Sequence, residues 1–226
     1  MKGVGAVIVA AGAGRRFGGG KPFALLAGRP LVEWSLAAFE AHPLVQAIVL
    51  VLADDSGKVL YRTKFRKVID VVRGGERRQD SVGCGFARLD PAATDVVLVH
   101  DGARPFVSAE LIGRVVEAAR LRGAAVPVVP VPDTIKEVDG GRVVRTIDRA
   151  RFGRVQTPQA FSYPLLEKAL AKARADGFRG TDDAVLIERC GAEVAVVEGD
   201  ARNIKITTPL DLRIAEGLCH EDRPRV

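Results

Sequence analysis

Residues 4–21 read VGAVIVAAGAGRRFGGGK, and this pattern indicates the class of fold. Residues 4–9 are apolar and rich in Val and Ile without any alternation, which is typical of a strand buried on both faces of a parallel sheet. Only alanine and glycine occupy residues 10–14, and such small residues let backbone N–H groups approach a phosphate or nucleobase closely. The cations Arg15, Arg16 and Lys21 follow. The stretch therefore predicts a first strand that ends in an anion-binding loop.

Similar apolar runs predict further strands at residues 48–52, 68–72, 96–99, 124–129 and 194–197. Between them lie helical patterns at residues 31–41, 81–89, 108–122, 163–175, 181–190 and 209–218. In the third pattern the apolar residues share one face, Ser108 is placed to cap the helix, and Gly123 ends it. Because strands and helices alternate, the sequence predicts an α/β fold with a mostly parallel sheet and helices on both faces.

One segment interrupts this alternation. Two short strand-like pieces, 134–138 and 142–146, flank Asp139-Gly140-Gly141, which is a hairpin turn signal. We therefore expect a β-arm inserted at about residues 133–147 of a single domain that spans residues 1–226. A decorative surface loop is the alternative. An isolated hairpin is marginally stable in water, so the β-arm should pack on something, and a two-fold partner offering the same arm is the economical solution.

Composition excludes several classes of protein. With 226 residues, 47% hydrophobic and 27% charged, the chain is typical of folded proteins. Its apolar runs fall far short of the ~20 residues of a membrane helix, and its N-terminus leads straight into the first predicted strand without a signal peptide. The cysteines Cys84, Cys190 and Cys219 are odd in number and lack metal-binding spacing, which predicts reduced thiols in a cytoplasmic protein.

The charge balance points to a small ligand. The formal net charge is +6, but aromatic residues make up only 5% of the chain and do not interleave with the basic residues. A stacking platform for a nucleic acid polymer is therefore not expected, and a small anion fits better.

The glycine-rich loop matches neither of two common nucleotide-binding motifs. Phe17 stands where the third glycine of G-x-G-x-x-G belongs, and Lys21 is followed by Pro22 instead of the Ser or Thr of a P-loop. Cations in such a loop can stabilise the charge of a transferring phosphoryl or nucleotidyl group. A dinucleotide-dependent oxidoreductase and a non-catalytic nucleotide-binding module remain as alternatives from other classes.

Eight ordered blocks cover nearly the whole chain. They are VAAGAGRR at 9–16 with Lys21, GGERRQDSV at 74–82, HDGARP at 100–105, DTIK at 133–136, DR at 148–149, QTPQ at 156–159, TDD at 181–183 and NIK at 203–205. Together they resemble the 2-C-methyl-D-erythritol 4-phosphate cytidylyltransferases of the non-mevalonate isoprenoid pathway. The resemblance implies a Rossmann-like nucleotidyltransferase that transfers CMP from CTP to this acceptor, works as a homodimer and uses Mg²⁺. A pentitol-phosphate cytidylyltransferase, such as a ribitol 5-phosphate enzyme, is the close alternative because its motifs overlap.

Carried over residue by residue, the resemblance assigns nucleotide binding to Ala10, Ala11, Gly12, Ala13, Gly75, Glu76, Arg78, Ser81, Asp101 and Gly102. Arg16 and Lys21 would stabilise the transition state, because two cations beside the α-phosphate can meet the extra charge of a five-coordinate phosphorus. The family's usual spacer is longer and ends Pro-Lys-Gln, whereas this chain reads GGGKPF at 18–23. Ser81 is also a plausible helix N-cap, and Asp101 could instead be a buried aspartate paired with Arg104.

The resemblance assigns the acceptor to Asp101, Thr134, Arg149, Thr181 and Lys205. Arg149 and Lys205 would position the attacking phosphate, and because arms exchange between subunits in the family, the site would be shared across the dimer. Mg²⁺ would be held mainly by CTP phosphates and water. Thr181 looks equally like a helix N-cap. His100 is not expected to act as a base, because the attacking phosphate is already an anion.

Overall fold

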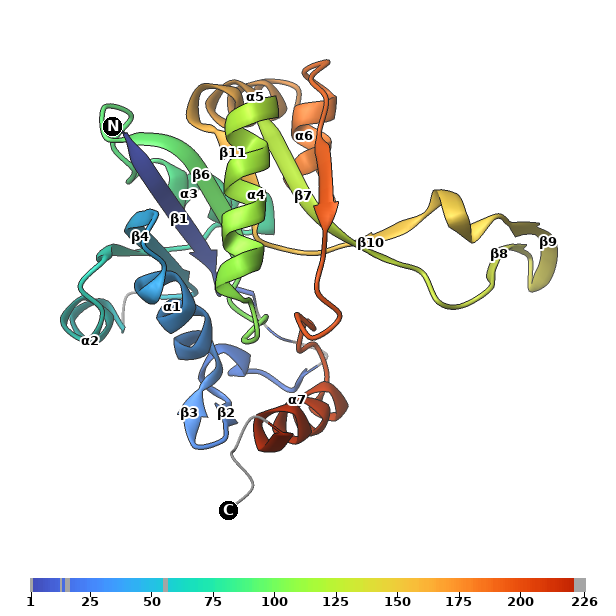
Figure 1. The fold of residues 1–226 in the computed structure, drawn as a ribbon, viewed down its shortest axis with the longest axis horizontal. Helices are drawn as coiled ribbons and strands as arrows, with labels where there is room; N and C mark the ends of the chain where they lie inside the picture. Colours follow the sequence, from blue (N-terminus) through green and yellow to red (C-terminus); the bar gives the residue numbers. More distant parts are fainter. Residues whose placement is uncertain (1, 13, 15–16, 55–56, 222–226) are drawn as a thin grey trace.

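An eight-stranded sheet forms the middle layer of the molecule (Figure 1). The computed structural model describes residues 2–12, 14, 17–54 and 57–221. The parallel strands are β1 (Gly3–Val9), β4 (Val45–Leu52), β5 (Val68–Arg73), β6 (Thr94–Asp101), β7 (Ala124–Pro130) and β12 (Ala195–Glu198). The antiparallel strands are β10 (Gly153–Val155) and β11 (Gln159–Ser162). The order is β10-β7-β11-β6-β1-β4-β5, with β12 also paired to β7, which confirms the predicted mostly parallel sheet.

Helices cover both faces of this sheet. One face packs under α1 (Leu31–Ala41), α2 (Lys58–Lys64) and α4 (Ala109–Arg122). The other packs under α3 (Arg78–Phe86), α5 (Tyr163–Ala175) and α6 (Ala184–Glu188). Along β1, Ile8 lies in the first core and Val7 in the second. This two-sided burial is why the strand shows no polar alternation.

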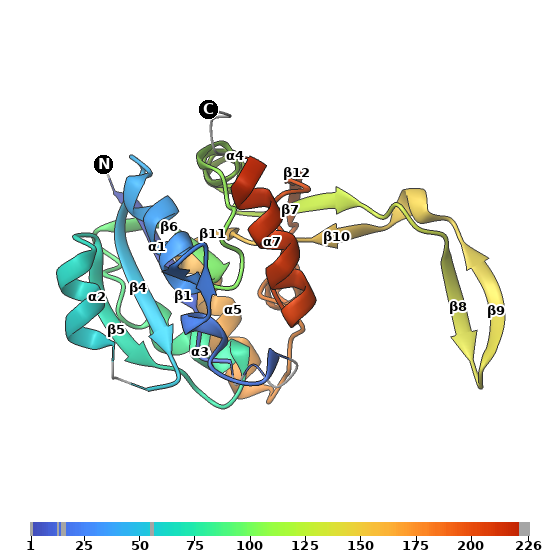
Figure 2. The same ribbon diagram turned by 90° about the horizontal axis from the view of Figure 1, so that it is seen from below.

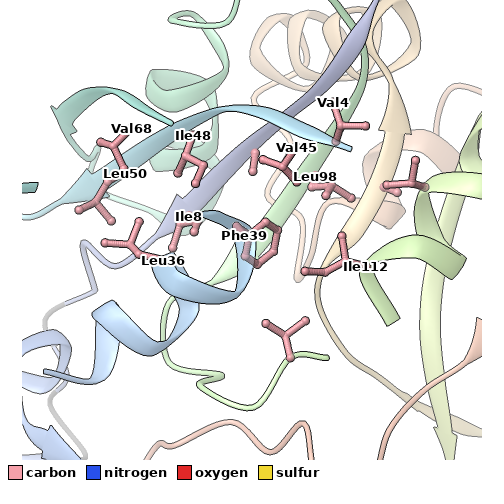
Figure 3. Packing of buried hydrophobic residues seen from close by; sticks show 14 of the residues in the cluster. Val4, Ile8, Leu36, Phe39, Val45, Ile48, Leu50, Val68, Leu98 and Ile112 are labelled. Carbon is pink, nitrogen blue, oxygen red and sulfur yellow. The ribbon is translucent and has the colours of Figure 1, made fainter. Parts of the chain in front are cut away.

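Figure 3 shows the first of these cores, where Ile8 and Leu98 of the sheet face Leu36 and Phe39 of α1. Phe39, Leu36 and Ile8 have no exposed surface. This packing fixes the strands whose carboxyl ends carry the glycine-rich loop and Asp101.

The β-arm is present and projects away from the sheet (Figures 1 and 2). It consists of β8 (Ile135–Asp139) and β9 (Arg142–Ile147), and it is followed by the 3-10 turn η3 (Arg149–Arg151). Gly140 and Gly141 have φ values of 53° and 77°, a left-handed backbone that glycine adopts at little cost. The predicted hairpin turn is therefore confirmed.

A third, smaller core joins the loops at the carboxyl edge of the sheet. It packs α7 (Pro209–Glu221) against α1, the loop after β6 and β2 (Leu25–Leu26), which pairs with β3 (Arg29–Pro30). Ile204 and Ile206, on either side of Lys205, lie in this core. The Ile206 N–H also donates to the Ala103 carbonyl at 2.9 Å. This small core therefore fixes the backbone that carries Lys205. No helix of the described residues is long and apolar enough to cross a membrane.

Candidate active site

The loops that follow β1, β5 and β6 meet at one edge of the sheet. Together with the turn η2 (Lys21–Phe23) and Lys205 they line a cavity of about 280 Å³, called here the Asp101 cavity. The carboxyl ends of parallel strands are where α/β proteins bind ligands. The predicted residues that line the cavity are Ala10, Ala11, Gly12, Lys21, Gly75, Glu76, Arg78, Ser81, Asp101, Gly102 and Lys205. Ala13 and Arg16 lie outside the described residues.

Small residues around the Asp101 cavity have a packing reason. A Cβ atom at Gly74 would lie 2.4 Å from Ala11 Cβ and 2.6 Å from Ser81 Oγ, and one at Gly102 would lie 3.2 Å from Ala10 Cβ. Larger residues would push these loops apart. The alanines and glycines therefore let the backbones of several loops converge on one ligand-sized space.

Asp101 is the central charge of the cavity. Its Oδ1 lies 2.9 Å from Arg78 Nε and its Oδ2 lies 2.6 Å from Lys205 Nζ. Burial alone would raise the pKa of this carboxyl, but the charges of Arg78 and Lys205 outweigh burial and hold the pKa well below its usual range. The expected alternative pairing with Arg104 is wrong, because Arg104 Nη1 donates instead to the Asn203 carbonyl at 2.7 Å.

Arg78 is held from behind by a second carboxylate that the sequence reasoning missed. Asp183 Oδ2 lies 2.6 Å from Arg78 Nη1, and Asp183 is fully buried. Its backbone N–H donates to Gln159 Oε1 at 3.1 Å. Arg78 thus bridges Asp101 and Asp183, which fixes the guanidinium in the cavity wall. The only sequence signal for Asp183 was its place beside Thr181 in the TDD block.

Of the helix caps expected from the sequence, Ser108 is confirmed, because its hydroxyl oxygen accepts from the Leu111 N–H at 3.2 Å, whereas Ser81 and Thr181 cap no helix. α3 begins at Arg78, so Ser81 lies inside the helix, and its hydroxyl donates to the Arg77 carbonyl at 3.1 Å. Arg77 is the N-cap residue instead, and the Asp80 carboxylate, three residues further on, accepts from the Arg77 N–H at 3.2 Å. At α6, which begins at Ala184, the carboxylate of Asp182 accepts from the Val185 N–H at 3.2 Å. Thr181 therefore caps no helix, because charged neighbours take the capping positions.

Three residues predicted to bind the acceptor do not line the Asp101 cavity of their own chain. Thr134 and Thr181 are exposed outside it. Arg149 donates to the Pro132 carbonyl at the base of the β-arm and lines a second hollow of about 920 Å³ beside β7, β12 and α6. Within one chain, the structure therefore brings together the described residues of the predicted nucleotide site and Lys205, but not the whole predicted acceptor site.

His100 lies immediately behind Asp101 and has no exposed surface. Burial lowers the pKa of this imidazole to about 4, whereas an unfolded histidine titrates near 6.5. Between those two values the unfolded chain binds a proton that the folded chain does not bind. The free energy of unfolding should therefore fall as the pH is lowered from 6.5 to 4, by up to about 3 kcal/mol from this residue.

Urea unfolding at pH 7 and at pH 4.5 checks this prediction, with His100→Asn as the comparison. The wild-type chain should lose more stability between the two pH values than the variant, which lacks the titrating ring. Equal losses in both chains would contradict the prediction.

Comparison with known proteins places the chain in one family. A model of the family "IspD: 2-C-methyl-D-erythritol 4-phosphate cytidylyltransferase" matches residues 4–221. Proteins named 2-C-methyl-D-erythritol 4-phosphate cytidylyltransferase from Bacillus velezensis and Geobacter metallireducens are 47% and 42% identical to this chain. The first match covers 94% of both chains, and the second covers 97% of this chain and 98% of the relative.

Solved structures agree with this placement. The 2-C-methyl-D-erythritol 4-phosphate cytidylyltransferase of Thermus thermophilus is 40% identical, with a TM-score of 0.81, over 95% of this chain and 98% of that one. The 4-diphosphocytidyl-2C-methyl-D-erythritol synthase of Anaerococcus prevotii is 33% identical, with a TM-score of 0.86, over 97% and 96% of the two chains. This chain therefore belongs to the 2-C-methyl-D-erythritol 4-phosphate cytidylyltransferase family.

Proposed function

We propose that this chain transfers the cytidylyl group of CTP to the 4-phosphate of 2-C-methyl-D-erythritol 4-phosphate at the Asp101 cavity and releases pyrophosphate. The observation that carries this proposal is the arrangement of Asp101 between Arg78 and Lys205. That arrangement shares one cavity with Lys21 and the glycine-rich loop. It offers a carboxylate for hydroxyl groups and cations for phosphates, which are the two kinds of group that this reaction presents.

The nucleotide would occupy the part of the cavity that lies between the loops after β1 and β5. We assign the backbone of 10–13 to the triphosphate and ribose, and the backbone of Gly75 and Glu76 to the cytosine edge. Arg78 and Ser81 line the same wall and would contact the nucleotide directly. Asp101 and Gly102 would contact the ribose and the acceptor.

The chemistry needs no base and no covalent intermediate on the protein. An oxygen of the acceptor's phosphate, already an anion, attacks the α-phosphorus, a new P–O bond forms, and the bond to the β-phosphate oxygen breaks as pyrophosphate leaves. Arg16 and Lys21 would meet the extra negative charge on the α-phosphate. Lys205 and Arg149 would hold the attacking phosphate in line, which removes orientational freedom before reaction.

The divalent cation that we propose is Mg²⁺. Among residues 2–12, 14, 17–54 and 57–221, no group of three or more His, Cys, Asp or Glu side chains could hold a metal ion. Mg²⁺ commonly binds through substrate phosphates and water with only one or two carboxylates. The residues therefore fit an ion carried in by the CTP phosphates beside Asp101, where it would neutralise phosphate charge.

We propose that two chains share each site through the β-arm. Val138, Val143 and Val144 of the β-arm are 67%, 61% and 57% exposed, and Figure 2 shows the arm extending away from its own sheet. Apolar side chains at this exposure favour burial against a second copy. The arm's base carries Thr134 and Arg149, which would then complete the acceptor site of the partner.

The reaction belongs in the cytoplasm under this proposal. Cys84, Cys190 and Cys219 form no disulfide in the described part of the chain. Thiols in this state favour a reducing compartment.

Replacing Lys21 with alanine should lower kcat by tens-fold or more, and Arg16→Ala should do the same. Loss of one group aimed at transition-state charge typically costs roughly 2.7–4 kcal/mol. Affinity for CTP in the ground state should change less. Steady-state pyrophosphate release checks this, with Lys168→Ala, an exposed lysine of α5, as the control. If kcat is retained and only the KM for CTP rises, the loop is a binding cradle and the transition-state role is wrong.

The acceptor is tested by pyrophosphate release from CTP and Mg²⁺ in parallel reactions with 2-C-methyl-D-erythritol 4-phosphate and ribitol 5-phosphate. We expect kcat/KM to favour the first acceptor. A preference for ribitol 5-phosphate would overturn the proposed substrate while leaving cytidylyl transfer intact. Stabilisation by NADH but not by CTP in a thermal-shift assay would overturn the reaction class.

A further inference from the structure

A buried hydrogen-bond network lies directly behind Asp101. The Asp101 N–H donates to Thr157 Oγ1 at 3.0 Å, and Thr157 Oγ1 lies 3.1 Å from His100 Nδ1. The other ring nitrogen, His100 Nε2, lies 3.1 Å from the Arg104 carbonyl. The ring of Phe39 packs against the imidazole, with centroids 4.9 Å apart. His100 and Thr157 are 0% and 5% exposed, so neither is placed to meet a substrate directly.

Donor and acceptor chemistry fixes the direction of each hydrogen bond in this buried network. The Arg104 carbonyl can only accept, so His100 Nε2 must carry the hydrogen. In a neutral ring Nδ1 is then an acceptor, and it takes the hydroxyl hydrogen of Thr157. The Asp101 N–H can only donate, and it uses a lone pair of the same hydroxyl. These polar groups are all satisfied in this one arrangement. Burial, which lowers the pKa of His100 to about 4, keeps the ring neutral at physiological pH.

Thr157 stands where a strand partner for Asp101 is missing. β11 begins only at Gln159, which is paired with Val99 of β6. Two residues further along the same antiparallel register, residue 157 faces residue 101. The β11 ladder has ended there, and the Thr157 hydroxyl supplies the acceptor that the buried Asp101 N–H requires.

Thr157 also holds the other side of the cavity. Its carbonyl accepts from Asn203 Nδ2 at 2.8 Å, and Asn203 is fully buried two residues before Lys205. Thr157 thus hydrogen-bonds to the backbone of Asp101 through its hydroxyl and to Asn203 of the Lys205 loop through its carbonyl.

We propose that Thr157, oriented by His100, is a positioning residue that sets the separation of Asp101 and Lys205. This inference rests on the proposed function, because that function gives the two charged groups their roles. It assigns His100 a fixed Nε2–H tautomer and no part in proton transfer to the substrate.

The test compares Thr157→Val with Thr157→Ser. Valine keeps the shape of the side chain but leaves the Asp101 N–H and His100 Nδ1 without their hydrogen-bond partner, whereas serine retains the hydroxyl. We expect kcat/KM to fall about tenfold or more in the valine variant, because two buried polar groups that hold Asp101 in place lose their hydrogen-bond partner. Serine should restore activity to within about twofold of wild type, as retention of the hydroxyl requires. Equal activity of valine and wild type would overturn the proposal, as would equal losses in both variants.

A second readout does not depend on turnover. The second readout is the ¹⁵N NMR spectrum of protein labelled at its histidines, of which the sequence has three. The His100 signals are those that vanish in His100→Asn. We expect a neutral ring with the hydrogen on Nε2 at pH 7, and a shift of the Nδ1 resonance in Thr157→Val but not in Thr157→Ser. A hydrogen on Nδ1, or no change in the valine variant, would overturn the proposal. A wild-type chain without activity would overturn the proposed function alone, and these signals would still decide the inference.

Discussion

Lys205→Ala is expected to lower kcat/KM by about 10²- to 10³-fold, the loss typical when one charge aimed at a reacting phosphate is removed. Lys205 Nζ lies 2.6 Å from Asp101 Oδ2 in the free chain. Its removal would take away a phosphate ligand, and it would also leave Asp101 with Arg78 as its one remaining ion-pair partner among the described residues. The carboxylate, then only partly compensated because Arg78 also pairs with Asp183, would repel the incoming phosphates, so two effects act in the same direction.

Pyrophosphate release with both substrates varied measures this loss. Lys168→Ala is the matched control, because it removes an equally charged residue from the exposed side of α5 and should leave kcat/KM unchanged. Unfolding in urea should show that Lys205→Ala remains folded. Activity within threefold of wild type, which is less than about 1 kcal/mol, would show that Lys205 plays no essential part.

Mixing Arg149→Ala with Lys205→Ala chains is expected to restore activity that neither variant has alone. If Arg149 serves the partner's cavity and Lys205 its own, a heterodimer collects both lesions in one site and leaves the other site intact. Each heterodimer should then reach about half of wild-type activity. Random re-pairing of a one-to-one mixture makes about half of the dimers heterodimers, so the mixture should reach about a quarter of wild type.

The control is a mixture of Lys205→Ala with Lys21→Ala, two residues that line the same cavity of one chain. In this heterodimer each of the two cavities carries one of the substitutions, so neither site is intact and no activity should return. Recovery in this control, or its absence in the Arg149 mixture, would contradict a site shared through the β-arm. An active monomer in sedimentation would contradict it as well.

Elements with strong local signals were predicted from the sequence. α1 and α5 begin and end where the apolar periodicity places them, and the turn at Gly140 fixes the β-arm. β11 has four residues and includes Gln159 and Ser162, so it carries no apolar run to detect. It inserts antiparallel between β6 and β7, a pairing set by tertiary contacts that no local pattern records.

The place of the candidate site in the fold could also be predicted from the sequence. The loops after β1, β5 and β6 follow buried strands, so their meeting at one sheet edge follows from the fold class. The groups that orient these loops were not predictable. Arg78 and Asp183 are 105 residues apart in sequence, and Asp101 and Thr157 are 56 apart. Such pairs depend on which loops converge, and a buried polar residue looks the same in sequence whether it binds substrate or holds a neighbour.

Direct transfer of a cytidylyl group at the Asp101 cavity can be followed in a single-turnover experiment. Excess protein is mixed with CTP carrying a radioactive α-phosphate, Mg²⁺ and 2-C-methyl-D-erythritol 4-phosphate, and the reaction is quenched in acid at successive times. We expect that label passes from CTP to 4-diphosphocytidyl-2-C-methyl-D-erythritol in one phase, that none is found on the protein, and that Lys205→Ala slows this phase. Label trapped on the denatured protein, or label that stays in CTP, would contradict this expectation.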